Sequence, residues 1–369
     1  MTHEAWMARA IRLARRGLYT TDPNPRVGCV LVKDGRLVAE GWHRKAGEPH
    51  AERMALASAG ADARGATAYV TLEPCCHHGR TPPCSDALIE AGVARVVVAM
   101  QDPNPLVAGQ GVAQLREAGI EVIDGVLEAG AAALNPGFIK RMSQGMPYVR
   151  CKLAMSLDGR TAMADGESKW ITSDASRRDV HRLRARSSAI VTGIGTVLAD
   201  DPSMTVRLPA EALDGIEREA DIRQPLRVVL DTHLALSPDA AILGQAGETV
   251  VVTTSDDDVL AEALMAAGAT LLRQDHSDAI DLAAVLAQLA DTGMNEVLIE
   301  AGATLAGAAI SAGVVDELVI YMAPHLMGDA ARGLLHLPGI GTMAQRIPLT
   351  LSDLRLIGPD IRLTYSLRK

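Results

Sequence analysis

The first half of the chain alternates short apolar runs with amphipathic stretches. Two apolar runs flank Lys33-Asp34-Gly35, a turn signal that predicts a β-hairpin. Two amphipathic stretches that end in glycine predict helices, and two more apolar runs are typical of buried parallel strands. In chain order we expect strands 27–32 and 36–42, helix 50–60, strand 66–74, helix 84–92 and strand 94–100.

The pattern restarts after the segment Ser143-Gln144-Gly145-Met146-Pro147, where we place a domain boundary between domains 1–145 and 146–369. Strand-like runs with helical stretches between them predict a second α/β domain. These runs are 148–162, 189–195, 226–232, 248–255, 296–302 and 315–324. At the other end of the chain, residues 3–17 lack the apolar core of a secretory signal and predict a surface helix that opens the first domain.

Composition narrows the class of protein. A length of 369 residues favours two domains, and 48% hydrophobic residues are enough for two cores. Aromatic residues make up 2% and the net charge is -9, which argues against a nucleic-acid platform. Five cysteines form no disulfide framework in a chain this long, and no apolar run is long enough to cross a membrane. We therefore expect a cytoplasmic protein.

The most specific motif is His50-Ala51-Glu52 followed by Glu73-Pro74-Cys75 and Cys84. A catalytic zinc site takes three protein ligands and keeps one position open. The pattern His-x-Glu, Pro-Cys, Cys is typical of zinc-dependent nucleobase deaminases, in which the glutamate transfers protons and does not bind the metal. Here His50, Cys75 and Cys84 are the expected ligands and Glu52 is the expected proton shuttle, although the two cysteines are farther apart than in the usual Pro-Cys-x-x-Cys.

Other readings of this motif remain open. Cys76, His77 and His78 are spare ligands that a closed, structural zinc site would use, so the chain would then be a zinc-stabilised binding module. A carboxylate two residues after the first ligand favours catalysis, and the Glu-Pro-Cys context favours Cys75 over Cys76. A deaminase of another nucleobase, with a second half that only binds nucleotide, is the alternative enzyme.

The second half carries two strand-to-glycine turns, at 189–196 and 300–307. Such turns can present backbone N–H groups to phosphate, but the full Gly-x-Gly-x-x-Gly fingerprint is absent. A tight turn and a nucleotide site are therefore equally good readings. Five arginines crowd one helical segment and form either a solvated face or, with Ser168 and Arg207, a clamp for a phosphomonoester. They are Arg177, Arg178, Arg182, Arg184 and Arg186.

Taken together, TLEPCCHHGRTPPC, HAERMAL, KLAMSLDGRTA, KWITS, GIGTVLADDP and IEAGATLAGA resemble the bifunctional riboflavin-biosynthesis deaminase/reductases over nearly the whole chain. Cys76 stands where that family usually has serine. The resemblance implies an N-terminal cytidine-deaminase-like three-layer α/β domain and a C-terminal dihydrofolate-reductase-like α/β domain. It implies one Zn2+ per chain in the first domain and NADPH in the second.

The activity that the resemblance implies has two consecutive steps. A phosphoribosylamino-diaminopyrimidinone is deaminated with release of ammonia, and NADPH then reduces the ribosyl side chain to ribityl. The partners implied are small phosphorylated pyrimidines, without nucleic acid or membrane, and the chain is expected to form a homo-oligomer, a dimer or tetramer.

The resemblance also implies a role for individual residues of this sequence. Deaminase positions that contact the pyrimidine or its ribose phosphate are Asn24, His43, Arg80, Asp102 and Asn104. Reductase positions that contact substrate are Ser168, Arg184, Arg207 and Glu300. Positions on the NADPH side are Ala154, Trp170, Thr196, Asp200, Thr232, Gly302, Ala303, Thr304, Leu305, Ala306, Gly307 and Ala308. Lys152 is expected to act in catalysis by hydrogen-bonding the opening sugar.

Overall fold

The computed structural model describes residues 1–77, 82–105, 107–275 and 279–367, which fold into two compact units. The first unit consists of Met1–Met146 together with Pro209–Ile222, and the second consists of Pro147–Leu208 and Arg223–Lys369. The stretch Pro209–Ile222 lies in the chain between two elements of the second unit. Its Gly215 has φ +80°, and a Cβ there would lie 2.0 Å from the carbonyl oxygen of Arg16, so glycine is required at this close approach.

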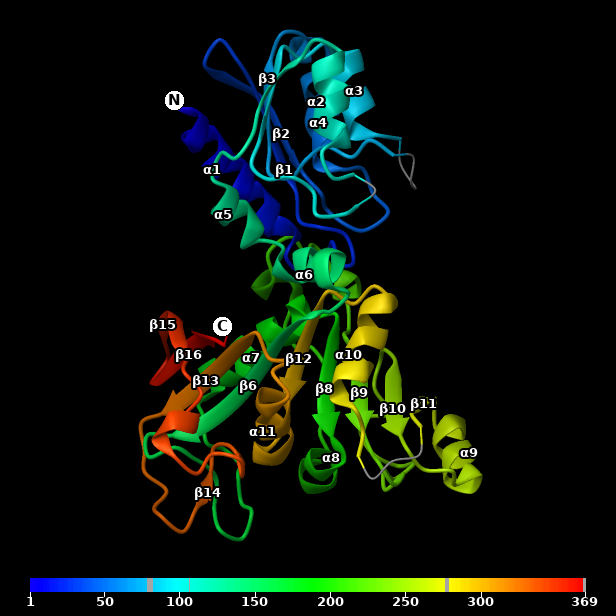
Figure 1. The fold of residues 1–369 in the computed structure, drawn as a ribbon, viewed down its shortest axis with the longest axis vertical. Coiled ribbons are helices and arrows are strands. Elements are labelled where there is room, and N and C mark those ends of the chain that lie inside the picture. Colours follow the sequence, from blue (N-terminus) through cyan, green and yellow to red (C-terminus); the bar gives the residue numbers. More distant parts are fainter. Residues whose placement is uncertain (78–81, 106, 276–278, 368–369) are drawn as a thin grey trace. The chain divides into compact units, whose positions relative to one another are not determined.

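The first unit contains a five-stranded sheet in the order β2-β1-β3-β4-β5 (Figure 1). β1 is antiparallel to β2 and β3, whereas β3, β4 and β5 run parallel. Its elements are α1 (His3–Ala14), β1 (Gly28–Lys33), β2 (Arg36–Trp42), α2 (Ala51–Ala59), β3 (Thr67–Val70), α3 (Cys84–Ala91), β4 (Arg95–Val98), α4 (Gln110–Glu117), β5 (Glu121–Ile123), α5 (Glu128–Ala132) and α6 (Pro136–Gln144). The predicted order of hairpin, helix, strand, helix and strand is confirmed.

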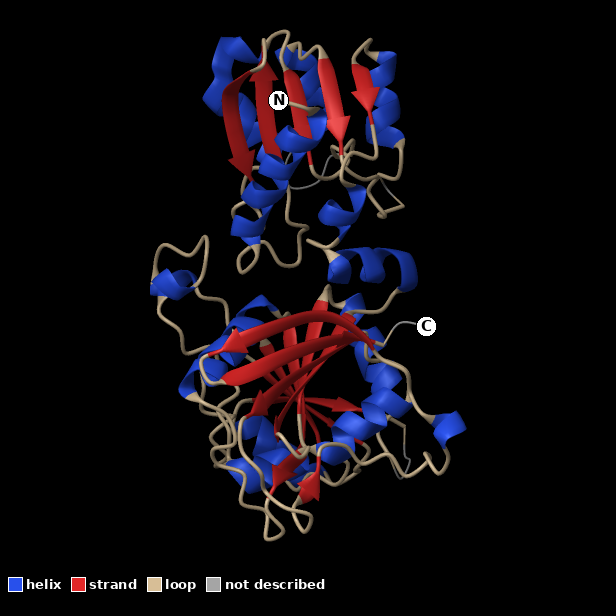
Figure 2. Ribbon diagram, turned by 90° about the vertical axis from the view of Figure 1, so that its left-hand side faces the viewer, coloured by secondary structure: helices blue, strands red, loops and turns tan. Residues whose placement is uncertain are grey.

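Both faces of this sheet are covered by helices, which gives the predicted three layers (Figure 2). Successive side chains of a strand point to opposite faces, so buried residues on neighbouring positions belong to different cores. In β1, Cys29 and Leu31 join the core that contains residues of α2, α3 and α4, while Val30 and Val32 join the core that contains residues of α1 and α6. A strand that is apolar at every position therefore indicates a central layer.

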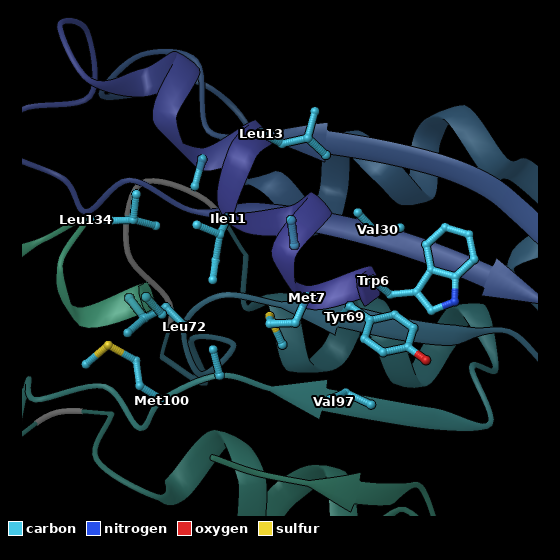
Figure 3. Packing of buried hydrophobic residues seen from close by; sticks show 14 of the residues in the cluster. Trp6, Met7, Ile11, Leu13, Val30, Tyr69, Leu72, Val97, Met100 and Leu134 are labelled. Atoms are coloured by element: carbon cyan, nitrogen blue, oxygen red, sulfur yellow. The ribbon is translucent and has the colours of Figure 1, made fainter. Parts of the chain in front are cut away.

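The N-terminal helix differs from its prediction as a surface helix. α1 contributes six buried residues to the second of these cores (Figure 3), which are Trp6, Met7, Ala10, Ile11, Leu13 and Ala14. Their spacing of three and four forms one apolar stripe, and the arginines that obscure this stripe in the sequence occupy the other face. The prediction of a helix that opens the first domain is confirmed, and what the structure adds is that its inner face is part of the core.

The second unit contains a nine-stranded sheet in the order β11-β10-β9-β8-β12-β6-β13-β16-β15, parallel from β11 to β13 and antiparallel from β13 to β15. A two-stranded sheet pairs β14 with β7. The elements are β6 (Tyr148–Ser156), β7 (Arg160–Ala162), α7 (Asp174–Arg186), β8 (Ala189–Gly193), α8 (Ile194–Asp200), β9 (Leu226–Leu230), β10 (Thr249–Thr253), α9 (Asp258–Ala266), β11 (Ala269–Arg273), α10 (Leu282–Asp291), β12 (Glu296–Glu300), α11 (Ala303–Ser311), β13 (Glu317–Ala323), β14 (Arg332–Gly333), β15 (Thr350–Ile357) and β16 (Asp360–Ser366).

The direction of this sheet's connections changes between β8 and β12. The chain leaves β8 through α8 and continues to β9, whereas it leaves the neighbouring β12 through α11 and continues to β13 on the opposite side (Figure 1). Open α/β sheets bind their ligands at the carboxyl ends of strands at such a point. No helix among the described residues is both long and apolar enough to span a bilayer.

Candidate metal centre and candidate cofactor site

Three elements of the first unit bring the predicted zinc ligands together. His50 caps the start of α2, Cys75 follows β3, and Cys84 is the first residue of α3. His50 Nδ1 lies 3.6 Å from Cys75 Sγ and 3.4 Å from Cys84 Sγ, and the ligand atoms of all three lie within 4.8 Å of one another. One imidazole and two thiols at these separations fit a tetrahedral zinc ion with one position left open.

Glu52 lies in the first turn of α2 and is 3% exposed. Its Oε2 is buried and has no hydrogen-bond partner among the described residues. Burial is the main cause that raises the pKa of Glu52 to about 7, and the nearby Cys75 raises it further. A buried carboxylate oxygen that the protein leaves without a partner is suited to exchange protons with a bound substrate.

The thiols of the centre differ in acidity. Hydrogen bonds from the Cys84 thiol, from His50 and from the Cys84 backbone N–H lower the pKa of Cys75 to about 4, although burial opposes them. The pKa of Cys84 is raised, first by its hydrogen bond to Cys75 and then by burial. Cys76 stands outside the three-ligand group and His77 lines the adjoining cavity, while His78 lies outside the described residues. This grouping supports an open site over a closed one.

A cavity of about 420 Å³ adjoins the metal ligands and Glu52. The predicted substrate residues Asn24, His43, Asp102 and Asn104 line it, whereas Arg80 lies outside the described residues. His43 is buried, and its Nδ1 donates to the carbonyl of Pro49 (3.2 Å) so that its Nε2 accepts from Asn24 Nδ2 (3.1 Å). The hydrogen bond to His43 uses the Nδ2 of Asn24, so the amide oxygen of Asn24 can accept a hydrogen bond from a ligand in the cavity.

Glu73 is a residue of this site that the sequence reasoning did not single out. Its side chain is 3% exposed and accepts three backbone N–H groups, from Asp102 (3.2 Å), Gly109 (2.9 Å) and Val112 (3.0 Å). Glu73 therefore fixes the loop that carries Asp102 and Asn104 next to the segment that carries Cys75. The sequence signal was its place directly before Pro74-Cys75, but only the fold shows what it binds.

In the second unit the predicted residues Lys152, Arg184 and Glu300 form one charged group. Arg184 on α7 makes a bidentate ion pair with Glu300 at the end of β12, with Nε–Oε1 at 2.6 Å and NH2–Oε2 at 2.9 Å. Lys152 on β6 is opposite Glu300 in the strand register. Burial lowers the pKa of Lys152, and Glu300 opposes this shift. The group lies beside the point where the sheet's connections change direction.

The arginine-rich helix is more than a solvated face. Arg184 pairs with Glu300, Arg186 NH2 lies 3.1 Å from the buried Glu296, and Arg177 lies over the ring of Trp170 at 4.4 Å. The helix also holds His181, which the sequence reasoning missed: its Nδ1 lies 3.1 Å from the carbonyl oxygen of Thr205. Burial, with Arg184 and Arg207 nearby, lowers the pKa of His181 to about 4, so the ring is neutral at neutral pH.

Both predicted glycine turns lie at this edge of the sheet. Thr196 Oγ1 on α8 accepts from the backbone N–H of Gly302, at the N-terminus of α11 (3.3 Å). A Cβ added at Gly195 or Gly302 would meet nothing within 4 Å, so the space in front of both turns is open. Two adjacent turns with open space and helix starts fit a dinucleotide pyrophosphate.

The other predicted NADPH residues lie around these turns. Lys169, next to the 70% exposed Trp170, contacts Asp200 at the end of α8 (Nζ–Oδ1 3.4 Å), and Thr232 follows β9. Gly302, directly before α11, and Thr304 within it are exposed, whereas Ala306 and Gly307 are buried. A Cβ at Gly307 would lie 1.9 Å from the carbonyl oxygen of His336, so Gly307 allows close packing of the helix. The other positions assigned to this side are Ala154 on β6 and Ala303, Leu305 and Ala308 on α11.

Two family models match the chain. One, described as the cytidine and deoxycytidylate deaminase zinc-binding region, matches residues 1–100, and the other, the RibD C-terminal domain, matches residues 147–363. Riboflavin biosynthesis protein RibD of Escherichia coli is 52% identical over 363 residues, which cover 98% of each chain. The RibD of Haemophilus influenzae is 49% identical over 98% of this chain and 96% of that one.

Solved structures agree with these matches. Acinetobacter baumannii RibD superposes with a TM-score of 0.90 at 50% identity, covering 99% of this chain and 98% of that chain. A diaminohydroxyphosphoribosylaminopyrimidine deaminase/5-amino-6-(5-phosphoribosylamino)uracil reductase from Thermotoga maritima superposes with a TM-score of 0.85 at 35% identity, with the same coverage. In each case the likeness extends over both units.

Proposed function

The chain belongs to the RibD family of riboflavin-biosynthesis deaminase/reductases, and on that premise we propose which of its residues carry out each reaction. The first reaction is the hydrolytic deamination of 2,5-diamino-6-(5-phosphoribosylamino)pyrimidin-4(3H)-one. The second is the NADPH-dependent reduction of the deaminated product to 5-amino-6-(5-phosphoribitylamino)uracil. The observation that carries the first assignment is that the Oε2 of Glu52 is buried beside the three-ligand group and has no hydrogen-bond partner in the part of the chain that the structure describes.

In the deaminase site His50, Cys75 and Cys84 would hold the zinc ion. Zinc supplies the Lewis acidity that makes water nucleophilic near neutral pH. Glu52 accepts the proton of the attacking water at Oε2 and delivers it to the departing ammonia. Asn24 and Asp102 line the same cavity and orient the pyrimidine through hydrogen bonds to its polar edge.

In the reductase site NADPH supplies the hydride for C1′ of the opened sugar. The first N–H groups of α11 would donate to its phosphates, and Thr196 would support this turn by accepting the Gly302 N–H. Lys152 hydrogen-bonds a ribose oxygen, while the carboxylate of Glu300, which is paired with Arg184, favours its charged form. Arg207 is exposed and close enough to Arg184 and Glu300 for their charges to act on its pKa, so we assign the substrate phosphate to Arg207 together with Ser168.

A two-stage assay tests the function as a whole. The purified chain is given the diaminopyrimidinone, ammonia release is followed, and NADPH absorbance is then recorded. We expect ammonia first and NADPH oxidation second. Ammonia without NADPH oxidation would contradict the reductase assignment, and NADPH oxidation only with separately prepared deaminated substrate would contradict the deaminase assignment.

Replacing Lys152 with methionine is expected to slow reduction by roughly 10- to 100-fold while deamination is unchanged. A hydrogen bond from a charged donor contributes about 1.5–3 kcal/mol, and methionine keeps a similar volume at this partly buried position. The measurement is NADPH oxidation with the deaminated substrate, and ammonia release from the same preparation is the control. An unchanged rate of NADPH oxidation would exclude Lys152 from the reaction.

The homo-oligomer, a dimer or tetramer, is a further part of the proposal. β15 is an edge strand of the nine-stranded sheet, and Leu351, Leu354 and Leu356 on it are 50%, 56% and 74% exposed. An apolar edge strand is an unfavourable surface unless another chain covers it, and a second copy offers the same strand for symmetric pairing. Light scattering on a Leu354→Glu, Leu356→Glu variant is expected to give a lower mass than the unaltered chain, and equal masses would rule out this surface.

A cytoplasmic location also remains a proposal. It is supported by five free cysteines, three of which, Cys75, Cys76 and Cys84, lie at or beside the metal centre. Thiols in this arrangement persist in a reducing compartment.

A further inference from the structure

The side of the deaminase cavity that is formed by helix α6 has no part in the reaction described so far. Phe138, Arg141 and Met142 of α6 line the cavity, and their spacing of three and four places them on one face of the helix. Phe138 is the only phenylalanine of the chain and is 8% exposed. The sequence analysis placed the end of the first domain at residue 145, directly after this helix, and assigned the helix no function.

Helix α6 is firmly attached to the segment that carries Asn24. Asn135, directly before the helix, accepts the backbone N–H of Arg26 at Oδ1 (2.8 Å) and donates from Nδ2 to the carbonyl of Arg26 (2.9 Å). The Arg26 guanidinium also donates to the carbonyl of Leu134 (2.7 Å). Asn135 and Arg26 are both buried. The Asn24 segment and the α6 face are therefore held as one continuous wall.

The charge of this wall is opposite to that of the rest of the cavity. Among the described residues that line it, Arg141 is the only lysine or arginine, whereas Glu48, Glu52, Glu73 and Asp102 are acidic. Arg141 is partly buried, and Asp22 acts on its charge. A phosphomonoester would be repelled by a cavity with these carboxylates, unless an arginine offered it the planar donor pair that fits phosphate oxygens.

We propose that Arg141 binds the 5-phosphate of the deaminase substrate, with Phe138 and Met142 as the apolar surface beside the sugar. The inference rests on the proposed function, which supplies the phosphorylated pyrimidine. A cavity of about 420 Å³ has room for a ligand of this class. The catalytic group and Arg141 then select the substrate together. The catalytic group recognises the amino-substituted ring, and Arg141 recognises the phosphate.

Arg141→Met and Lys140→Met form a matched pair for the test, because each removes one cation from α6 and Lys140 is not part of the cavity lining. Ammonia release is measured with the phosphorylated substrate and with its dephosphorylated counterpart. For Arg141→Met we expect the KM of the phosphorylated substrate to rise roughly 10- to 100-fold while kcat changes little. The dephosphorylated substrate should show no such change, Lys140→Met should behave as the unaltered chain, and Arg141→Lys should recover part of the loss.

An equal loss with both substrates would overturn the proposal, because it would assign Arg141 a structural role. An unchanged KM in Arg141→Met would overturn it as well. Calorimetric titration of the zinc-loaded chain with ribose 5-phosphate gives a separate readout. Because the second unit is assigned its own phosphate site at Arg207, two binding events are expected; one of them should weaken in Arg141→Met, and both should persist in Lys140→Met. If the unaltered chain releases no ammonia from the diaminopyrimidinone, the proposed function fails, and this titration still decides whether Arg141 binds phosphate.

Discussion

Replacing Glu52 with glutamine is expected to reduce deamination by roughly 10²- to 10⁴-fold while zinc stays bound. Glutamine has nearly the same shape but neither accepts nor returns a proton at neutral pH. Glu52 is 3% exposed and its Oε2 is without a protein partner among the described residues, so the substitution breaks no described hydrogen bond of that oxygen. Ammonia release and the zinc content of the same preparation are the two measurements.

The matched control for Glu52→Gln is NADPH oxidation with the deaminated substrate, which uses residues of the second unit and should be unaffected. Full deamination by the variant would contradict the catalytic role of Glu52 and would favour the alternative hypothesis, in which zinc only stabilises the fold. Loss of zinc together with activity would be a different result, because it would show that Glu52 supports the metal centre.

The second large effect is expected from the pair Cys75→Ala and Cys76→Ala. Cys75 Sγ lies 3.6 Å from His50 Nδ1 and within 4.8 Å of the other ligand atoms, whereas Cys76 is outside this group. Zinc stoichiometry should fall from about one per chain towards zero in Cys75→Ala and stay near one in Cys76→Ala. Deamination should follow the zinc content, since the metal activates the water.

The two cysteine variants control for each other because the two residues are adjacent and each substitution removes one thiol group. If Cys76→Ala loses the metal and Cys75→Ala keeps it, the ligand assignment is reversed. If both lose the metal, the centre is a closed four-ligand site, and the catalytic reading loses its open position. Reductase activity checks that each variant has folded.

The alternative functions are disfavoured by the extent of the family match and by the number of ligands in the metal centre. The reading as a deaminase of another nucleobase needed a second half that only binds nucleotide, but the RibD C-terminal domain matches residues 147–363 and RibD relatives cover 98% of the chain. The binding-module reading needed a fourth zinc ligand, and the group that the described residues form has three. Individual residue roles remain predictions that the variants above address.

The sequence by itself predicted which residues the candidate metal centre brings together, because they lie close to one another along the chain. His50 and Glu52 are two residues apart at the start of one helix, and Cys75 and Cys84 flank one loop, so their spacing already indicates a shared site. Apolar runs likewise predicted strands of both sheets, and in β1 the alternate residues of the run are buried in the cores on the two faces of the first sheet.

Only the tertiary structure decided the features that depend on contacts between distant segments. Glu73 holds backbone N–H groups 29 to 39 residues further along the chain, and Asn135 pairs with Arg26 across 109 residues. Such contacts give no periodic pattern in the sequence. A single side chain accepts or donates a hydrogen bond with the backbone of a distant segment, and the amino-acid composition of that segment does not indicate the contact. The same holds for Pro209–Ile222, which packs with the first unit, and for α6, whose arginine reaches the deaminase cavity only once the chain has folded.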